Sequence, residues 1–279
     1  MYNYVMMGGK TVIAEILEKN GVHLYAAIPV SCLEIKKPYL LRSFTGDAYA
    51  VFIAIPYYTG IKSNLAAFAA VPDYHKFANK LFSEVSGHVK EKYGREAMGF
   101  ADHSPFDEIR GALACGLGVL GDNGLLITER YSSFVCIGEL VCELTADELR
   151  AEGVPVLNEP LETKFCYHCG ACSRECPAFA TGDKSYCLSA ISQKKGELTD
   201  REISLLEKSP YVWGCDVCQL ACPITKAAIA AGTIETKIGY FKNSHIEEMT
   251  LEYLDRMTDD EYADYTFSWR KRDVMERNL

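Results

Sequence analysis

The feature that most constrains this chain is a run of cysteines that begins at Cys166. Cys166, Cys169 and Cys172 repeat at every third residue, and Cys176 follows directly before Pro177. Bacterial ferredoxins use this spacing to bind [4Fe–4S] clusters: the first three thiolates hold one cluster, and the cysteine before proline holds a second. The run therefore predicts two clusters, and it requires further cysteines elsewhere in the chain.

A second, looser set follows in the sequence, with its last member again before a proline. It consists of Cys187, Cys215, Cys218 and Cys222. Because the cysteine before proline crosses over in paired motifs, we expect one cluster on Cys166, Cys169, Cys172 and Cys222, and the other on Cys176, Cys187, Cys215 and Cys218. The remaining four, Cys32, Cys115, Cys136 and Cys142, lie among apolar residues and are interpreted as small buried hydrophobic side chains.

Two other interpretations of the cysteines remain. Disulfide frameworks are typical of short secreted chains, whereas this chain has 279 residues and begins without a charged segment followed by an apolar one. Structural zinc also uses Cys-x2-Cys pairs, but it uses two separated pairs and not an unbroken triple. The spacing favours iron–sulfur clusters over both.

Length and composition indicate the number of domains and the cellular compartment. A mass of 31.0 kDa with 48% hydrophobic residues suits one large domain and one small one. We find no apolar run of about 18 residues, so no membrane span is expected. Unpaired thiols and clusters indicate a reducing compartment, and we expect the cytoplasm. The net charge of −9 argues against a general phosphate-binding surface.

The first third of the chain predicts alternating helices and strands. We expect a helix over Gly9–Asn20, a strand over His23–Val30, a second helix capped by Ser31, and a buried strand over Tyr49–Pro56. A long amphipathic helix is expected from Pro72 to about Tyr93. Pro72 and Asp73 are ordinary helix-start residues, but a helix start does not require Tyr74 and His75.

A further strand, Glu96–Ala101, is expected to end directly before Asp102. A carboxylate after a strand and before a helix is well placed to face a pocket. Position alone leaves open a second interpretation, in which Asp102 or Ser104 caps a helix that begins at Pro105. His103 is a weaker candidate for a functional side chain.

Four glycines lie between Cys115 and Thr128, at Gly116, Gly118, Gly121 and Gly124. They resemble the dinucleotide-binding pattern, but they follow a helix and precede a strand, which is the reverse of its context. We therefore exclude a Rossmann site. The next elements are expected to be strands over Leu125–Thr128 and Phe134–Leu144, so the sheet mixes adjacent and crossover strands.

A polar connector over Thr145–Thr163 predicts a domain boundary. We expect an α/β domain over residues 1–163, a double-cluster domain over 164–243 with a helical insert at Leu188–Ser209, and a helical tail over 244–279. The tail begins acidic and ends basic, and such charge runs are usually solvated helix faces.

Taken together, these segments resemble the epoxyqueuosine reductase family, iron–sulfur enzymes that depend on cobalamin and are related in plan to reductive dehalogenases. The resemblance rests on the segments 73–76, 99–102, 116–127 and 137–140, on both cysteine sets, and on the ends Trp269–Arg272 and Arg277–Leu279. It covers nearly the whole chain. The glycine segment and the placement of Asp102 make it more specific than the cysteines alone.

The resemblance implies an α+β chain in which a mixed α/β, nitroreductase-like domain binds cobalamin and a ferredoxin-like domain carries two [4Fe–4S] clusters. Electrons from a flavodoxin- or ferredoxin-type donor would pass through the clusters to cobalt and then to the substrate. Asp102 would donate a proton while a C–O bond is reduced, so we expect burial to raise its pKa. The residues expected to contact the cofactor are Asp73, Tyr74, His75, Gly118, Gly121 and Asn123.

Two departures from the family bear on the substrate. Family members usually carry Lys at the position of Asp122, and larger members continue past the Arg-Asn-Leu end into a repeat domain that helps hold tRNA. Both lead us to expect a small molecule or modified nucleoside as substrate, with tRNA less favoured. The alternative function is a two-cluster electron carrier or binding protein, which leaves some 160 preceding residues without a role.

Overall fold

A four-stranded antiparallel sheet forms the centre of the first half of the chain. The computed structural model describes residues 12–44, 47–180 and 183–279. The strands β1 (Leu24–Pro29), β2 (Tyr49–Pro56), β6 (Val135–Cys142) and β3 (Ala97–Phe100) lie in the order β1-β2-β6-β3. Strand β6 therefore lies between β2 and β3, which confirms the expected mixture of adjacent and crossover strands.

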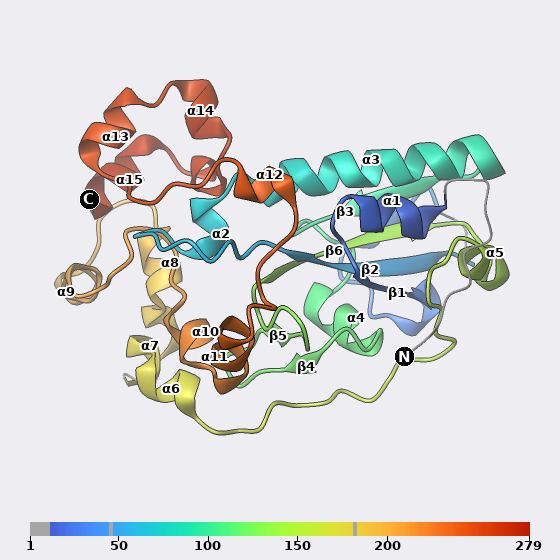
Figure 1. Ribbon diagram of the computed structural model, residues 1–279, viewed down its shortest axis with the longest axis horizontal. Helices are drawn as coiled ribbons and strands as arrows, with labels where there is room; N and C mark the ends of the chain where they lie inside the picture. The colour runs from blue at the N-terminus through green and yellow to red at the C-terminus, as the bar shows by residue number, and fades with distance from the viewer. Residues whose placement is uncertain (1–11, 45–46, 181–182) are drawn as a thin grey trace.

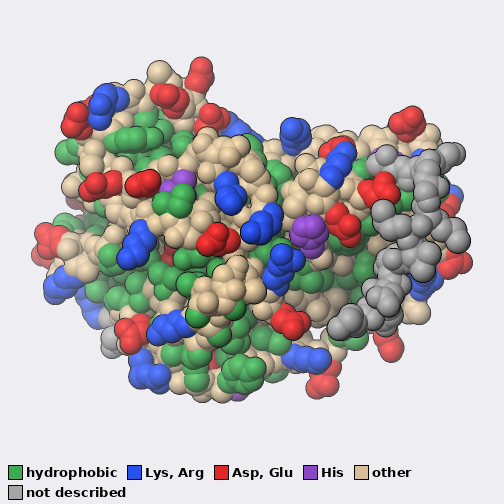
Figure 2. Space-filling view, in the orientation of Figure 1, with side chains coloured by type: hydrophobic (Ala, Val, Ile, Leu, Met, Phe, Trp, Pro, Cys, Tyr) green, Lys and Arg blue, Asp and Glu red, His purple; other side chains and the backbone are tan. Residues whose placement is uncertain are grey.

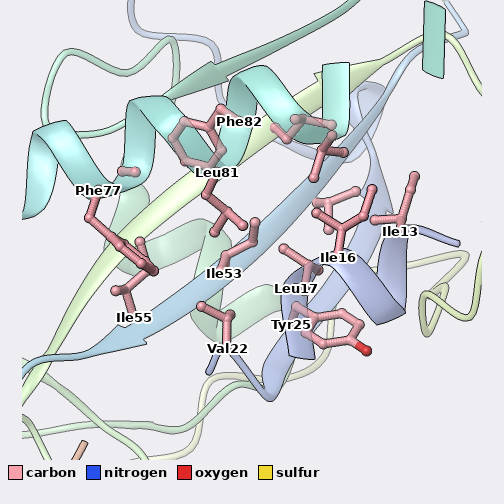
Figure 3. Packing of buried hydrophobic residues seen from close by; sticks show 14 of the residues in the cluster. Ile13, Ile16, Leu17, Val22, Tyr25, Ile53, Ile55, Phe77, Leu81 and Phe82 are labelled. Carbon is pink, nitrogen blue, oxygen red and sulfur yellow. The ribbon is translucent and has the colours of Figure 1, made fainter. Parts of the chain in front are cut away.

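Helices cover both faces of this sheet (Figure 1). Helices α1 (Ile13–Lys19) and α3 (Tyr74–Tyr93) lie on one face, and α4 (Glu108–Ala114) lies on the other. Figure 3 shows Phe77 and Leu81 of α3 next to Ile55 and Ile53 of β2, whereas Phe82 packs over Gly99 of β3 and Gly138 of β6. Phe77, Leu81, Val85 and Val89 follow one another at intervals of four residues and are all buried, so they form one side of the helix, as the sequence predicts.

The two faces of β6 enter different cores. Leu140 and Cys142 belong to the core under α1 and α3, whereas Val141 belongs to the core under α4. Because side chains alternate along a strand, Ile137 and Glu139 share the α4 face with Val141. A carboxyl group therefore lies in the interior of the sheet on that side.

The second half of the chain is helical. Its elements are α6 (Ala171–Glu175), α7 (Pro177–Ala180), α8 (Leu188–Ser192), α9 (Asp200–Glu207), α10 (Val217–Ala221), α11 (Pro223–Ala230) and α12 (Gly239–Lys242), followed by α13 (Leu251–Arg256), α14 (Asp259–Ala263) and α15 (Arg272–Asn278). Ile238 and Phe241 pack in the same core as α1 and α3. The helical half is therefore packed against the α/β half.

Side chains of the basic C-terminal segment bind backbone carbonyls of the same chain. Arg272 donates to the carbonyl oxygens of Leu254 and Met257, both at 2.7 Å, and Arg277 donates to those of Lys194 and Gly196, both at 2.8 Å. Arg270 donates to the Gln193 carbonyl. Arg270 and Arg277 hold the tail against the α8–α9 region, and Arg272 joins α15 to α13 within the tail, so these guanidinium groups are already used within the fold.

Several local expectations are wrong or incomplete, because other residues cap the helices or interrupt them. Ser31 caps no helix and lies in a 3₁₀ turn, Val30–Cys32. The helix expected from Pro105 begins at Glu108, and the insert Leu188–Ser209 forms two helices separated by Gly196. The polar connector contains α5 (Ala146–Ala151), whose capping box starts at Thr145. The first residues of the helix expected over Gly9–Asn20 lie outside the described residues.

Among the residues that the structure describes, no helix is both long and apolar enough to cross a bilayer. On the face shown in Figure 2, basic and acidic side chains alternate, and neither sign dominates a large area.

Candidate functional site

Asp102 lies in the loop that leaves β3, with the backbone in the left-handed region at φ 60°. This conformation is uncommon for a residue other than glycine, and it is found most often at functional sites. The Asp102 amide donates to Oε1 of Glu108 at 2.8 Å, which holds the loop against the start of α4. The cap of α4 is Asp107, which accepts from the Arg110 amide at 3.0 Å. Asp102 is therefore not the helix cap.

The first residues of α3 meet Asp102 from the neighbouring element. His75 Nε2 lies 3.0 Å from Asp102 Oδ2, and the Tyr74 hydroxyl donates to the same oxygen. Asp73 caps α3 by accepting from the His75 amide, and its Oδ1 lies 2.7 Å from His75 Nδ1. Both nitrogens of the imidazole thus face carboxylates, and the Tyr74 ring stacks on it with centroids 4.2 Å apart.

The protonation state of Asp102 differs from the one that the sequence led us to expect. Burial alone raises the pKa of Asp102, but the hydrogen bonds from His75 and Tyr74 outweigh it and hold this pKa below its usual value. The expectation of a raised pKa is therefore wrong in this structure. The two carboxylates instead raise the pKa of His75 to about 10, with the hydrogen bond from Asp102 the largest cause. At neutral pH the proton is held on His75, next to the Asp102 carboxylate.

A cavity of about 260 Å³ adjoins this group. Tyr74, Asp102 and Glu108 line one part of it, and Cys136 and Ile137 of β6 line another. Burial raises the pKa of Glu108 to about 7 and that of Cys136 well above its ordinary value. Sequence reasoning missed Glu108 and treated Cys136 as a core residue, because the alternation of β6 and the path of the loop were needed to bring them here.

The first predicted cysteine group gathers around one small cavity. Its lining includes Cys166, Cys169, Cys172 and Cys222, together with Asn123 of the glycine segment. The position of Cys166 follows from strand β4 (Val119–Leu120), since the Cys166 amide donates to the Leu120 carbonyl at 3.0 Å. Four thiols around one space are the donor set that a [4Fe–4S] cluster needs.

The second predicted group gathers where α6 and α10 pack against each other. Burial raises the pKa of Cys218 to about 11, and the nearby Cys176 and Cys187 add to this effect. Burial likewise raises the pKa of Cys215 to about 12, with Cys218 and Cys187 acting in the same direction. Cys218 thus lies within electrostatic range of the other three thiols, and Cys215 also within range of Cys187, which fits a cluster. Metal binding would lower the pKa values of these thiols, because the deprotonated thiolate is the form that binds a metal.

The glycine segment forms a hairpin of β4 and β5 (Leu126–Ile127). A Cβ at Gly118 would lie 2.4 Å from the carbonyl oxygen of Ile127, and one at Gly121 would lie 2.4 Å from Oδ1 of Asn123. These two glycines are therefore required by the hairpin itself. Asn123 Nδ2 lies 3.9 Å from the sulfur of Cys218, so this side chain faces the cysteines.

Beside the hairpin lies a hollow of about 1020 Å³. Gly118 and Ile127 line it, as do the basic side chains of Arg130, Lys164 and Lys237. This volume is at the upper end of the range for ligand pockets. One further group lies near its rim, where the His168 ring nitrogen Nδ1 lies 2.7 Å from Asp122 Oδ1, close to Cys166.

Comparison with known proteins confirms the resemblance to epoxyqueuosine reductases. The chain is 30% identical over 209 residues to the epoxyqueuosine reductase of Gloeobacter violaceus, covering 72% of this chain and 62% of that protein. It is 29% identical over 163 residues to that of Lactococcus garvieae, covering 55% and 42%. The chain thus matches between two fifths and two thirds of the length of these relatives. No protein-family model matches the sequence.

Solved structures of epoxyqueuosine reductases share the fold. A selenomethionine-labelled epoxyqueuosine reductase superposes with a TM-score of 0.72 at 19% identity, covering 95% of this chain and 78% of that one. A complex with an epoxyqueuosine-modified tRNA stem loop gives 0.68, and a Bacillus subtilis structure whose catalytic aspartate loop has swung out of the active site gives 0.67. Both have the same identity and coverage. The mixed α/β architecture is thus that of this group.

Proposed function

We propose that this chain, a relative of the epoxyqueuosine reductases in sequence and fold, is a cobalamin-dependent iron–sulfur reductase. Its substrate would be an oxygen-containing modified nucleoside whose C–O bonds are reduced. In this proposal residues 1–163 form the corrinoid-binding domain, nitroreductase-like in plan, residues 164–243 form a ferredoxin-like domain with two [4Fe–4S] clusters, and residues 244–279 form the tail.

The observation that carries the proposal is the position of the glycine hairpin. Leu125 and Leu126 line the cavity of Asp102, whereas Asn123 and Ile127 line the cavity of the first four cysteines. One short hairpin thus separates a proton-carrying group from a set of thiols suited to a redox cluster. A reductase needs electrons and protons to arrive at one place, and this arrangement supplies both from opposite sides.

The residues fit the implied cofactors. Cys166, Cys169, Cys172 and Cys222 would hold one cluster, and Cys176, Cys187, Cys215 and Cys218 the other. The corrinoid would lie at the cavity beside Asp102, with Tyr74 in its wall and Asp73 and His75 joined to Asp102 by hydrogen bonds. Gly118, Gly121 and Asn123 would approach it from the hairpin, since Gly121 and Asn123 bind Leu125 of the cavity wall. A bound corrinoid would supply a cobalt centre that accepts electrons from the clusters and passes them to the substrate.

In the protein itself, the proton chemistry is carried by Asp102 and its partners. His75 holds a proton next to the Asp102 carboxylate, and Tyr74 fixes the same oxygen. Asp102 can therefore pass a proton from His75 to the substrate oxygen, and then return to the carboxylate form. The Bacillus subtilis relative is described with a catalytic loop that carries an aspartate, which supports the same role for the Asp102 loop.

The relatives are epoxyqueuosine reductases, so the proposed substrate carries an epoxide. Reduction of an epoxide to an alkene breaks two C–O bonds, forms one C=C bond, consumes two electrons and two protons, and releases water. The electrons would come from a one-electron donor of the flavodoxin or ferredoxin type in a reducing compartment such as the cytoplasm. A relative is solved with a modified tRNA stem loop, which supports a nucleoside carried on RNA.

Binding of full-length tRNA is nevertheless expected to be weak. The net charge is −9, and Arg270, Arg272 and Arg277 already bind carbonyls within the chain. Few phosphates would be neutralised, so we expect a shallow dependence of affinity on salt. Sub-micromolar binding at physiological salt would contradict this expectation.

The alternative function is a two-cluster electron carrier. It would explain the eight cysteines but not the arrangement of Asp102, His75 and Tyr74 around a cavity. Conversion of an epoxyqueuosine-modified stem loop to queuosine by the anaerobically reconstituted protein, with cobalamin and a chemical reductant, tests the proposal directly. Product formation that requires cobalamin supports the enzyme. Loaded clusters without any product, and without retained cobalamin, would support the carrier.

The cluster assignment has its own test. Because the cysteines before proline cross over, Cys222→Ala should disable the cluster that Cys166, Cys169 and Cys172 hold, and Cys176→Ala should disable the other. Iron analysis and EPR spectra of the two reduced variants would distinguish the clusters. Loss of the same cluster in both variants would show that the pairing is wrong.

A further inference from the structure

Glu139 is completely buried, and its carboxyl oxygens have no hydrogen-bond partner among the described residues. It lies in the middle of β6, its exposed fraction is 0%, and neither carboxyl oxygen receives a hydrogen bond from any described residue. A buried polar group without a partner costs about 1–3 kcal/mol, and an ionised one costs more. Side chains of this kind are rarely retained for stability alone.

The position of Glu139 connects it to the Asp102 cavity. On β6 it lies two residues beyond Ile137 on the same face, and Ile137 lines that cavity. On the neighbouring strand its register partner is Phe100, two residues before Asp102. Glu139 therefore lies directly behind the cavity wall, on the side from which the Asp102 loop departs.

The polar groups that act on Glu139 belong to this loop and its surroundings. Burial, with Glu108 and Asp102 acting in the same direction, raises the pKa of Glu139 to about 8, against the lowering effect of the Ser104 hydroxyl and the Lys37 cation. Ser104 is itself buried and accepts from the Phe106 amide at 2.9 Å, so its O–H group remains free to donate. Glu139 thus holds a proton near neutral pH, beside Ser104 and within electrostatic range of Glu108.

The proposed reaction requires more protons than the Asp102 group can hold. Each epoxide reduction consumes two protons, whereas the Asp102–His75 pair can give up one at neutral pH, because the pKa of His75 is raised to about 10 and Asp102 is already ionised. A second source must lie close to the cavity and must be shielded from bulk water while the substrate covers the opening. Glu108 lines the cavity, and Glu139 lies behind it.

We propose that Glu139 is a proton reservoir that supplies the second proton to the Asp102 cavity, with Ser104 and Glu108 as the groups that carry it. The inference rests on the proposed reductase function. In each turnover Glu139–COOH would lose one proton toward Glu108 and regain it from solvent after the product leaves. The electrons come from the external donor, so Glu139 undergoes no redox change.

Glu139→Gln tests the proposal, because glutamine has nearly the shape of the protonated acid but cannot release a proton. Infrared difference spectra between the wild-type chain and Glu139→Gln at pH 7 would reveal the carbonyl band of a buried protonated carboxylic acid. Turnover of the reconstituted enzyme would be measured in parallel. We expect kcat to fall by about 10- to 100-fold with little change in KM, and the remaining activity to lose its decline above pH 8.

Glu152→Gln is the matched control, because Glu152 is an equally buried glutamate that lies away from the cavity and has partners. It should leave kcat unchanged at a temperature where the variant is folded. If Glu139→Gln does not fold, Glu108→Gln removes the next proton carrier while its amide oxygen can still accept from the Asp102 amide. That variant should show the same loss of kcat.

The infrared and kinetic measurements distinguish failure of the proton-reservoir proposal from failure of the proposed reductase function. The infrared band does not depend on substrate, so the absence of any difference between wild type and Glu139→Gln at pH 7 would overturn the proposal, whether or not the chain is a reductase. Wild-type kcat in Glu139→Gln would also overturn it, while leaving the proposed function intact. Loss of the band together with loss of kcat supports the reservoir.

Discussion

The two ends of helix α3 carry the same kinds of side chain but in different environments. At its first turn, Tyr74 and His75 meet the carboxylate of Asp102. At its last turns, His88 and Tyr93 meet the carboxylate of Glu152. Figure 1 shows α5, which ends beside Glu152, at the far end of this helix from α2.

The difference between the ends lies in exposure and in the number of partners. Glu152 is 0% exposed and accepts from the Ile13 amide, His88, Lys92 and Tyr93 at 2.6–2.9 Å. Asp102 has a side chain that is 59% exposed, in a strained backbone conformation beside a cavity. Contact between an acid, a histidine and a tyrosine is therefore not sufficient to identify a catalytic site. Open space and exposure distinguish the end that we propose to be functional from the end that stabilises the fold.

The largest expected effect concerns the stabilising end. Glu152→Gln leaves the charged Lys92 and the amide of Ile13 without their carboxylate, and we expect the free energy of unfolding to fall by about 3 kcal/mol. Urea denaturation followed by circular dichroism measures this change. Glu96→Gln, which disrupts only an exposed ion pair with Lys90, is the control and should change stability by less than about 1 kcal/mol. Equal stabilities of the two variants would contradict the comparison.

At the end that we propose to be catalytic, Asp102→Asn should lower turnover by at least about 100-fold, because the amide cannot pass a proton. Folding, iron content and cobalamin binding should remain as in the wild type. Asp107→Asn provides the control, since asparagine is also a good helix cap and Asp107 caps α4. Full activity of Asp102→Asn in a cobalamin-dependent assay would show that this end has no catalytic role.

The pH dependence of stability should have opposite signs for Glu152 and for Glu139, the buried carboxyl group behind the Asp102 cavity. Several donors lower the pKa of Glu152, so its contribution is present above pH 4.5 and is lost as the pH falls. The pKa of Glu139 is raised to about 8, so the folded chain should lose about 2 kcal/mol between pH 6 and pH 8. Unfolding at a series of pH values checks both signs. Glu152→Gln should flatten only the acid limb, and Glu139→Gln only the alkaline limb.

The smallest expected effect is a gain in stability. Glu139→Met replaces an unpaired acid by an apolar side chain of similar length, so we expect about 1 kcal/mol of stabilisation at pH 6. Thermal unfolding detects this as a raised Tm. Destabilisation would mean that Glu139 has a partner that stabilises the fold, and it would remove the contrast with Glu152.

The sequence predicted those parts of the molecule whose signals are local. The buried strand Tyr49–Pro56 has the expected bounds, and α3 and β6 lie within two residues of theirs. Asp102, Tyr74 and His75 were singled out as separate segments, and the structure brings them together. Cysteine spacing is also local, and it led to the two groups of four thiols that the fold gathers.

The rest depended on contacts between residues far apart in the chain. The donors to Asp102 lie 27 and 28 residues away, and without them the direction of its pKa shift could not be predicted. The partners of Glu152 are separated from it by 59 to 139 residues. Glu139 was noticed only as part of a family segment, because its lack of partners becomes visible only once β2, β3 and α4 surround it.

The central claim is that one chain combines a corrinoid pocket with two clusters, and retention of cobalamin tests it most directly. The protein is purified and reconstituted anaerobically, incubated with cobalamin and passed through gel filtration. We predict that corrin absorption elutes with the protein together with cluster absorption and about eight iron atoms per chain, as two [4Fe–4S] clusters require. Cluster absorption alone, with all corrin bands eluting at the volume of free cobalamin, would contradict the account and leave an electron carrier.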